Sequence, residues 1–195
     1  MTQHTVGIDL GTTNCALAFS NLSDDSGDVI PIPQLTAPGV VEERFLLPSF
    51  IYTAKEGEFP ASALALPWDK DISYAAGEFA RSHGAKVPTR LVASAKSWLS
   101  HSSVDRTSAL LPWQAPPEVD RISPVEASAR YLRHLAVLSV QVCGDRHSLE
   151  LQPRHHYHRG TLRNAAQMVS HAPVSVQHPP CKSGRFGDVW LTKGY

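Results

Sequence analysis

The chain has 195 residues, of which 18 are basic and 18 are acidic, and 42% of its residues are hydrophobic. This composition is typical of a globular protein and excludes a disordered or fibrous chain. The balanced charge gives no general attraction to nucleic acid or to an anionic membrane, so neither partner is expected. No apolar run approaches the roughly 20 residues that span a bilayer, and no basic segment precedes a hydrophobic stretch at the N-terminus, so we expect a cytoplasmic protein.

The first twenty residues predict a β-hairpin. Val6, Ile8 and Leu10 are apolar at every second position, and a second apolar run at residues 16–19 follows a short polar connection. Alternation with period two is typical of a strand with one buried face. The three apolar residues therefore share one face of the first strand, and Asp9 lies on the other.

Further elements follow along the chain. Residues 29–32 and 45–52 predict a second pair of strands, separated by a loop that contains Pro and Gly. Residues 74–83 have helical spacing. The sequence thus indicates an α/β fold with an opening hairpin, a sheet and flanking helices.

Ser123 marks the start of a longer helix. Ser can cap the first free amides, Pro124 fits the first turn, and Glu126 at the third position can close a capping box. Apolar residues then follow at steps of four, three and four positions. This spacing predicts one buried face, formed by Tyr131, Leu135, Leu138 and Val142.

The composition changes near Cys143. Residues 1–143 carry a net charge of −4, whereas residues 144–195 carry +4 and include five histidines between positions 155 and 178. The tail has no sustained apolar period that would offset the entropy of ordering it. We therefore expect two regions, residues 1–142 and residues 143–195, of which the second is poorly ordered.

The connection within the first hairpin has the chemistry of a phosphate-binding loop. Gly11 lets the backbone turn closely, and the Thr12 and Thr13 hydroxyls and the following amides can donate to phosphate oxygens. Asp9 supplies a carboxylate that can hold the water shell of Mg²⁺. The alternative is a tight turn in which Gly, Thr and Asn14 serve the backbone alone.

Residues 6–18, read as one string, resemble the first phosphate motif of the heat-shock protein 70 (DnaK-like) chaperone family. Sugar kinases of the actin-like superfamily share its Asp-x-Gly-Thr-Thr core. Four later segments occur in the chaperones' order and are similar to their Pro-Ser strand, their Gly-x-x-Ala-basic helix, their lysine segment and their Ile-Ser-Pro-x-Glu helix start. These segments are residues 47–51, 76–81, 91–99 and 122–126.

The resemblance implies an actin-like (ribonuclease H-like) ATPase lobe that binds ATP or ADP with Mg²⁺. It places Gly11, Thr12, Thr13 and Asn14 at phosphate. Asp9 at the metal's waters and Lys96 near the γ-phosphate are the catalytic residues that it implies. A lysine there stabilises negative charge that develops during phosphoryl transfer. In the family, the further partners are unfolded peptides and co-chaperones.

The resemblance ends near residue 138. The family's second phosphate loop, its adenosine-binding segment and its peptide-binding domain have no counterpart in this sequence. We therefore expect a truncated first lobe with an incomplete second lobe, which is inactive alone because catalysis needs both phosphate loops. A frameshift would explain the tail from residue 143; a genuine tail that folds alone or binds a partner is the alternative.

Two other classes of function remain open. One is a sugar or metabolite kinase of the same superfamily. The other is a non-enzymatic interaction protein that keeps the lobe as a scaffold. The kinase predicts nucleotide turnover that responds to a sugar, whereas the scaffold predicts no nucleotide binding.

Overall fold

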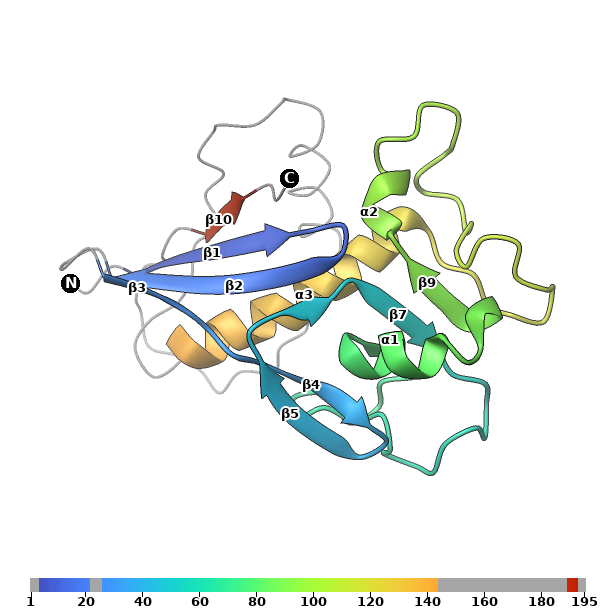
Figure 1. Ribbon diagram of the computed structural model, residues 1–195, viewed down its shortest axis with the longest axis horizontal. Helices are drawn as coiled ribbons and strands as arrows, with labels where there is room; N and C mark the ends of the chain where they lie inside the picture. The colour runs from blue at the N-terminus through green and yellow to red at the C-terminus, as the bar shows by residue number, and fades with distance from the viewer. Residues whose placement is uncertain (1–3, 22–25, 144–188, 193–195) are drawn as a thin grey trace.

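The fold is mixed α/β, with several antiparallel sheets and few helices (Figure 1). It was obtained as a computed structural model, which describes residues 4–21, 26–143 and 189–192. The strands of these residues form three sheets.

The first sheet is built around the opening hairpin. β1 (His4–Leu10) and β2 (Asn14–Asn21) pair antiparallel, with Ile8 opposite Leu17, which confirms the predicted hairpin. On its other side β2 pairs with β3 (Ser26–Val29) and with β6 (Leu47–Pro48).

The longest helix, α3 (Pro124–Cys143), packs against β1 and β2 (Figure 1). Val6, Ile8 and Leu17 are buried beneath it, as the period of two predicts. On the helix, the predicted positions 131, 135 and 138 are all buried. The side chain of Val142 lies outside the described side chains.

The start of α3 is capped as expected at Ser123 but not at Glu126. The Ser123 Oγ accepts from the Glu126 N–H at 3.0 Å. The Glu126 carboxylate does not close the capping box, because it forms ion pairs with Arg130 at 2.9 Å and Arg133 at 2.8 Å instead. Two guanidinium partners on the next turns outcompete a single backbone amide.

The region between the hairpin and α3 holds two small sheets. β4 (Ile32–Ala37) pairs antiparallel with β5 (Val40–Arg44). In the other sheet β7 (Phe50–Thr53) lies between β8 (Tyr74–Ala76) and β9 (Leu91–Ala93). The short helices are α1 (Glu78–Gly84), a 3₁₀ turn (Pro88–Arg90) and α2 (Ala95–Trp98).

The predicted pairing of residues 29–32 with residues 45–52 is wrong. The intervening segment is itself the β4–β5 hairpin, which turns at Gly39 with a φ of 73°. Residues 45–52 instead contain two strands in different sheets. β6 pairs with β2 in the first sheet, and β7 pairs with β8 and β9. The predicted helix at residues 74–83 begins later, because Tyr74–Ala76 pairs with β7 as a strand.

One element lies beyond residue 143. β10 (Val189–Thr192) pairs parallel with β1, with Leu191 opposite Ile8. The sequence predicts no element in this tail, so these four residues differ from the expectation. Residues 144–188 and 193–195 lie outside the described residues, and the boundary near residue 143 stays a prediction.

Within the described ranges, no helix has the length and hydropathy needed to cross a membrane.

Candidate phosphate-binding site

The loop between β1 and β2 is a close turn built on Gly11. A Cβ at this position would lie 2.0 Å from the Asn14 carbonyl oxygen. Any other residue would therefore displace the turn. Gly11 is buried, whereas Thr12 and Thr13 are exposed. Both threonine side chains are thus accessible to a ligand.

Ser49, which lies between β6 and β7, holds this turn from outside the hairpin. Its N–H donates to the Thr13 carbonyl at 2.8 Å, and its Oγ donates to the Gly11 carbonyl at 2.9 Å. In a trans peptide the N–H points opposite to the C=O, so the Thr12 amide points away from Ser49. The turn therefore directs a backbone donor away from the protein segment that supports it.

Lys96 reaches the same turn from α2. Its Nζ donates to the carbonyl of Leu10, 86 residues away in the chain. The preceding Ser94 has a left-handed backbone with φ 52°, and Ala95 is buried. A left-handed non-glycine residue is a strained conformation that the surrounding structure must support. The tertiary structure thus holds the start of α2 so that Lys96 faces the hairpin.

Asp9 lies on the face of β1 opposite to α3. It pairs with Ala16, and the next pair on that face is Gly7 with Ala18. All four residues are partly buried. This face of the hairpin therefore carries one carboxylate among small side chains, directly before the Gly11 turn. The predicted alternation of the two faces is confirmed.

Cys15 lies beneath the turn and is fully buried. Its Sγ is 3.3 Å from the Ser49 Oγ. Burial raises the pKa of the Cys15 thiol to about 11, an effect that its hydrogen bond with Ser49 partly offsets. Since the thiolate is the reactive form, this cysteine serves packing rather than nucleophilic chemistry.

The structure brings together all the residues that the sequence analysis assigned to the site. Asp9, Gly11, Thr12, Thr13 and Asn14 lie at the hairpin, and Lys96 contacts it. The sequence analysis gave Ser49 no role, although its Pro-Ser segment was noted as similar to a family strand. That similarity marks the segment but not its contacts, which depend on the tertiary structure.

The hairpin carries donors suited to phosphate and one carboxylate suited to a hydrated Mg²⁺. Mg²⁺ keeps several of its waters and needs few direct protein ligands. Among the described residues, no group of three or more His, Cys, Asp or Glu side chains gathers as an all-protein metal cage would. A single carboxylate beside phosphate donors fits a Mg²⁺ that arrives with its nucleotide.

A comparison with protein-family models and with curated proteins finds no match to this chain.

Proposed function

We propose that residues 5–138 form the ATP- and Mg²⁺-binding first lobe of an actin-like ATPase of the DnaK-like chaperone type. The observation that carries this proposal is the convergence of two distant segments, those of Ser49 and Lys96, on the turn of the opening hairpin. Ser49 bonds to the carbonyls of Gly11 and Thr13, and Lys96 bonds to that of Leu10. These are the same segments whose sequences resemble the phosphate loop, the Pro-Ser strand and the lysine segment of that family.

The proposed site works by placing positive and hydrogen-bonding groups around phosphate. The hydroxyls of Thr12 and Thr13 and the backbone amide of Thr12 donate to phosphate oxygens. The Lys96 ammonium leaves the Leu10 carbonyl and pairs with the terminal phosphate. There it offsets the negative charge that develops during phosphoryl transfer. Asp9 holds waters of the Mg²⁺, and the bound metal supplies neutralisation of the phosphate charges.

In the wider proposal, ATP-driven folding of unfolded peptides with co-chaperones is the activity to which this lobe contributes, in the cytoplasm. Hydrolysis needs groups on both sides of the terminal phosphate. The described residues supply one phosphate loop. We therefore propose that this chain binds nucleotide but turns it over slowly unless another lobe completes the site.

A calorimetric titration of the chain with Mg-ATP tests the proposal. We expect saturable binding, which Lys96→Ala weakens by about tenfold or more, since a charge-assisted contact with phosphate contributes about 1.5–3 kcal/mol. Asp9→Asn should remove the difference between ATP with and without Mg²⁺, and should leave thermal stability nearly unchanged.

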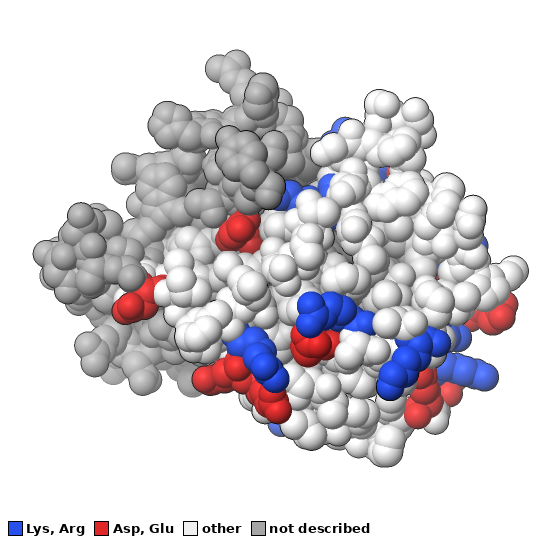
Figure 2. Space-filling view, in the orientation of Figure 1, with Lys and Arg blue, Asp and Glu red and all other residues white. Residues whose placement is uncertain are grey.

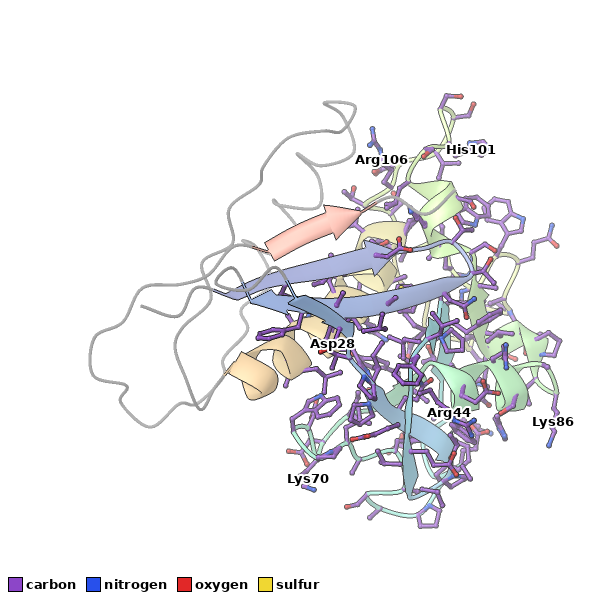
Figure 3. The ribbon with its side chains drawn as sticks, turned by 60° about the vertical axis from the view of Figure 1, so that its left-hand side comes forward. Asp28, Arg44, Lys70, Lys86, His101 and Arg106 are labelled. Atoms are coloured by element: carbon purple, nitrogen blue, oxygen red, sulfur yellow. The ribbon has the colours of Figure 1, made fainter. Side chains whose placement is uncertain are left out.

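Lys86→Ala is the matched control, because it removes the same charge from an exposed residue after α1 (Figure 3). It should bind Mg-ATP like the unchanged chain. Absence of any binding, or equal loss in the Lys86 and Lys96 variants, would contradict the proposed site. Absence of binding would favour the non-enzymatic scaffold, and turnover stimulated by a sugar rather than by an unfolded peptide would favour the kinase.

A further inference from the structure

β5 is an exposed edge strand with apolar side chains. Among the described strands it pairs only with β4. Val40 and Val41 expose 46% and 37% of their surface, and Phe45, which directly follows the strand, exposes 61%. The open backbone groups of an edge strand accept another strand, and the charges of β5 at positions 42–44 are of both signs, so they can pair across such a contact. β5 is therefore a candidate interaction surface.

The outward-facing backbone groups of β5 can be assigned from its pairing with β4. Pro33 stands opposite Glu43, has no N–H, and has a carbonyl that accepts from the His134 Nε2 at 2.9 Å. This pair therefore exchanges no ladder hydrogen bonds, and the bonds to β4 come from the neighbouring positions such as Glu42. Since the bonding direction alternates along a strand, the N–H and C=O groups of Val41 and Glu43 face the open edge.

The sequence of this edge is complementary to itself. Residues 41–45 read Val-Glu-Glu-Arg-Phe, with the two oppositely charged residues and the two apolar residues placed symmetrically about Glu43. In an antiparallel pair of two such strands centred on Glu43, Glu42 stands opposite Arg44 at two places. Val41 stands opposite Phe45 at two places. Opposite charges and apolar pairs across strands both favour pairing.

We propose that β5 is a dimerisation surface, on which two copies of this chain join their β4–β5 hairpins into one antiparallel four-stranded sheet. Such an interface is isologous, because the same surface serves both copies. Its central hydrogen bonds run between the outward-facing groups of the two Glu43 residues, and the outward-facing groups of Val41 lie on either side of them. This surface is separate from the proposed nucleotide site and does not depend on it.

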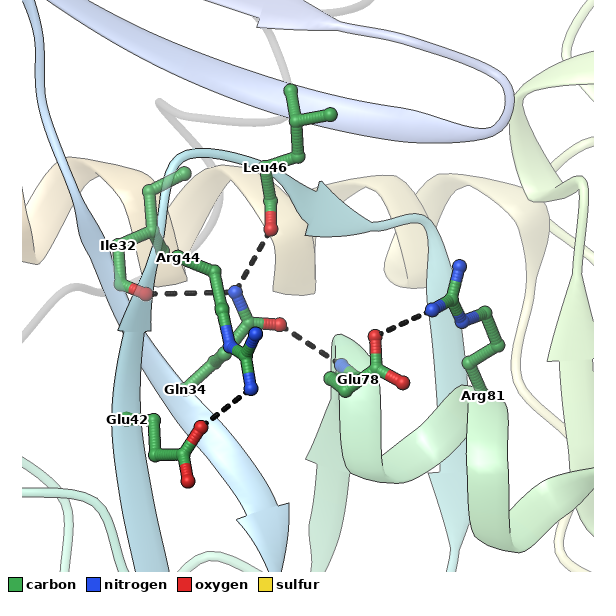
Figure 4. A network of polar contacts seen from close by, with 7 residues as sticks. All are labelled: Ile32, Gln34, Glu42, Arg44, Leu46, Glu78 and Arg81. Carbon is green, nitrogen blue, oxygen red and sulfur yellow. Dashed lines mark hydrogen bonds and ion pairs between the residues drawn. The ribbon is translucent and has the colours of Figure 1, made fainter.

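The charges around β5 are arranged for exchange between copies. In the single chain, Arg44 pairs with Glu42 of its own strand at 2.5 Å, and both side chains remain about half exposed (Figure 4). On pairing, each Arg44 exchanges this contact for Glu42 of the other copy. Acidic and basic side chains are interspersed over the face that carries β5 and α1, so no single-sign patch repels a second copy (Figure 2).

The like-charged contact at the centre of the pairing explains why the dimer is weak. Two Glu43 side chains face each other there, and like charges directly opposite are destabilising. The interface is also small, because it involves one short strand from each copy. We therefore expect a concentration-dependent dimer, and Glu43→Gln should tighten it by a few fold.

Sedimentation velocity across a range of concentrations tests the proposal on the full chain. We expect reversible dimers for the unchanged chain. Glu43→Pro should abolish them, because it removes the outward N–H but no bond to β4. Thermal unfolding of this variant checks that the hairpin stays folded.

A pair of charge variants gives a test that does not depend on proline. Arg44→Glu leaves only acidic residues at positions 42–44, and Glu42→Arg places arginine on both sides of Glu43. Each variant alone should dimerise about tenfold or more weakly, because like charges then stand opposite each other. An equimolar mixture should form heterodimers, because each Glu then faces an Arg.

The proposal is overturned if the unchanged chain stays monomeric at every concentration. It is also overturned if a dimer forms that neither Glu43→Pro nor the charge variants weaken, since another surface would then be responsible. Heterodimers that form no better than the single-variant homodimers would overturn the proposed register.

Discussion

His134 on α3 is a buried histidine whose surroundings favour its neutral form. Its Nε2 donates to the Pro33 carbonyl at 2.9 Å, and its ring stands edge-on to Trp68 with ring centres 5.1 Å apart. Burial lowers the pKa of the imidazole from 6.5 to about 4, and the hydrogen bond to Pro33 offsets only part of this effect. A protonated ring could still donate to the Pro33 carbonyl, but burial makes the charged form unfavourable at this position.

The buried position of His134 makes the stability of the fold sensitive to acid. Above pH 6.5 the imidazole is neutral in both the folded and the unfolded chain, and its contribution is complete. As the pH falls from 6.5 to about 4, the unfolded chain binds a proton that the folded chain does not, so stability is lost. We expect a loss of about 3 kcal/mol over this window from this residue, measured by denaturant unfolding at a series of pH values.

His134→Gln isolates this effect, because the amide can still donate to the Pro33 carbonyl but does not titrate. The variant should lose less stability than the unchanged chain between neutral and acidic pH. His101→Gln, at an exposed position, is the control and should keep the original pH dependence. Equal acid sensitivity in all three proteins would show that His134 does not titrate in this window.

At the scale of single residues, the sequence predicts the residues proposed to bind phosphate better than it predicts the residues that hold them in place. Gly11 and Lys96 could be named because a turn and a cationic group have recognisable chemistry in sequence. The Ser49 contacts could not, because they depend on a neighbouring strand 38 residues away. His134 was missed for the same reason: its partner Pro33 lies 101 residues away.

Among the elements, α1 depends on a side chain from another strand for its start. Its N-cap, Gly77, has no side chain, and the Glu78 N–H instead donates to the Gln34 Oε1 of β4 at 2.9 Å (Figure 4). The Gln34 Nε2 donates to the Leu46 carbonyl at 2.9 Å. Gly77 has a φ of 89°, and a Cβ there would lie 2.4 Å from the Gln34 Oε1. Gly77 therefore leaves the space that the Gln34 side chain occupies, and Gln34 connects the start of α1 to the Leu46 backbone.

Gln34→Leu should destabilise the chain by about 2 kcal/mol or more, because it leaves the Glu78 N–H and the Leu46 carbonyl without their partner. Gln34→Glu should also destabilise the chain, because it keeps the acceptor for the Glu78 N–H but places a carboxylate at a fully buried position beside the Leu46 carbonyl. Chemical unfolding of both variants measures the difference.

Arg44→Ala is the comparison from the same neighbourhood, because it removes an ion pair whose two side chains are about half exposed. Exposed pairs contribute at most about 1 kcal/mol, so this variant should unfold close to the unchanged chain. If Gln34→Leu were no more harmful than Arg44→Ala, the junction would not depend on Gln34.

The elements that the sequence predicts are those with a regular apolar period. Among their described side chains, the β1–β2 hairpin and α3 each bury one face, at steps of two positions in the hairpin and of three to four in the helix. The β4–β5 hairpin was missed because Pro33 and Gly39 both indicate a loop. In the structure Pro33 occupies a position without ladder bonds and Gly39 forms the turn, so both residues are compatible with strands.

At the scale of the whole molecule, the first sheet joins the two ends of the chain. β10 pairs with residues 6–9 of β1, so a segment near the C-terminus extends the sheet that carries the candidate phosphate site. Sequence reasoning could not predict this, because a four-residue strand has no measurable period and its pairing spans almost the full chain. A parallel partner at such a distance is fixed only by the tertiary fold.

Removing β10 should therefore weaken β1 selectively. Each backbone hydrogen bond contributes about 1 kcal/mol net, so a chain that ends at Cys143 should lose about 2–4 kcal/mol of stability relative to the full chain. Hydrogen exchange should accelerate at alternate amides of residues 6–9, those directed toward β10, while the amides that bond to β2 stay protected. A chain lacking only residues 193–195 is the control and should behave like the full chain. If the amides of β1 exchanged equally in the full and the shortened chains, residues 189–192 would contribute nothing to the sheet, and the ordered fold would end near residue 143.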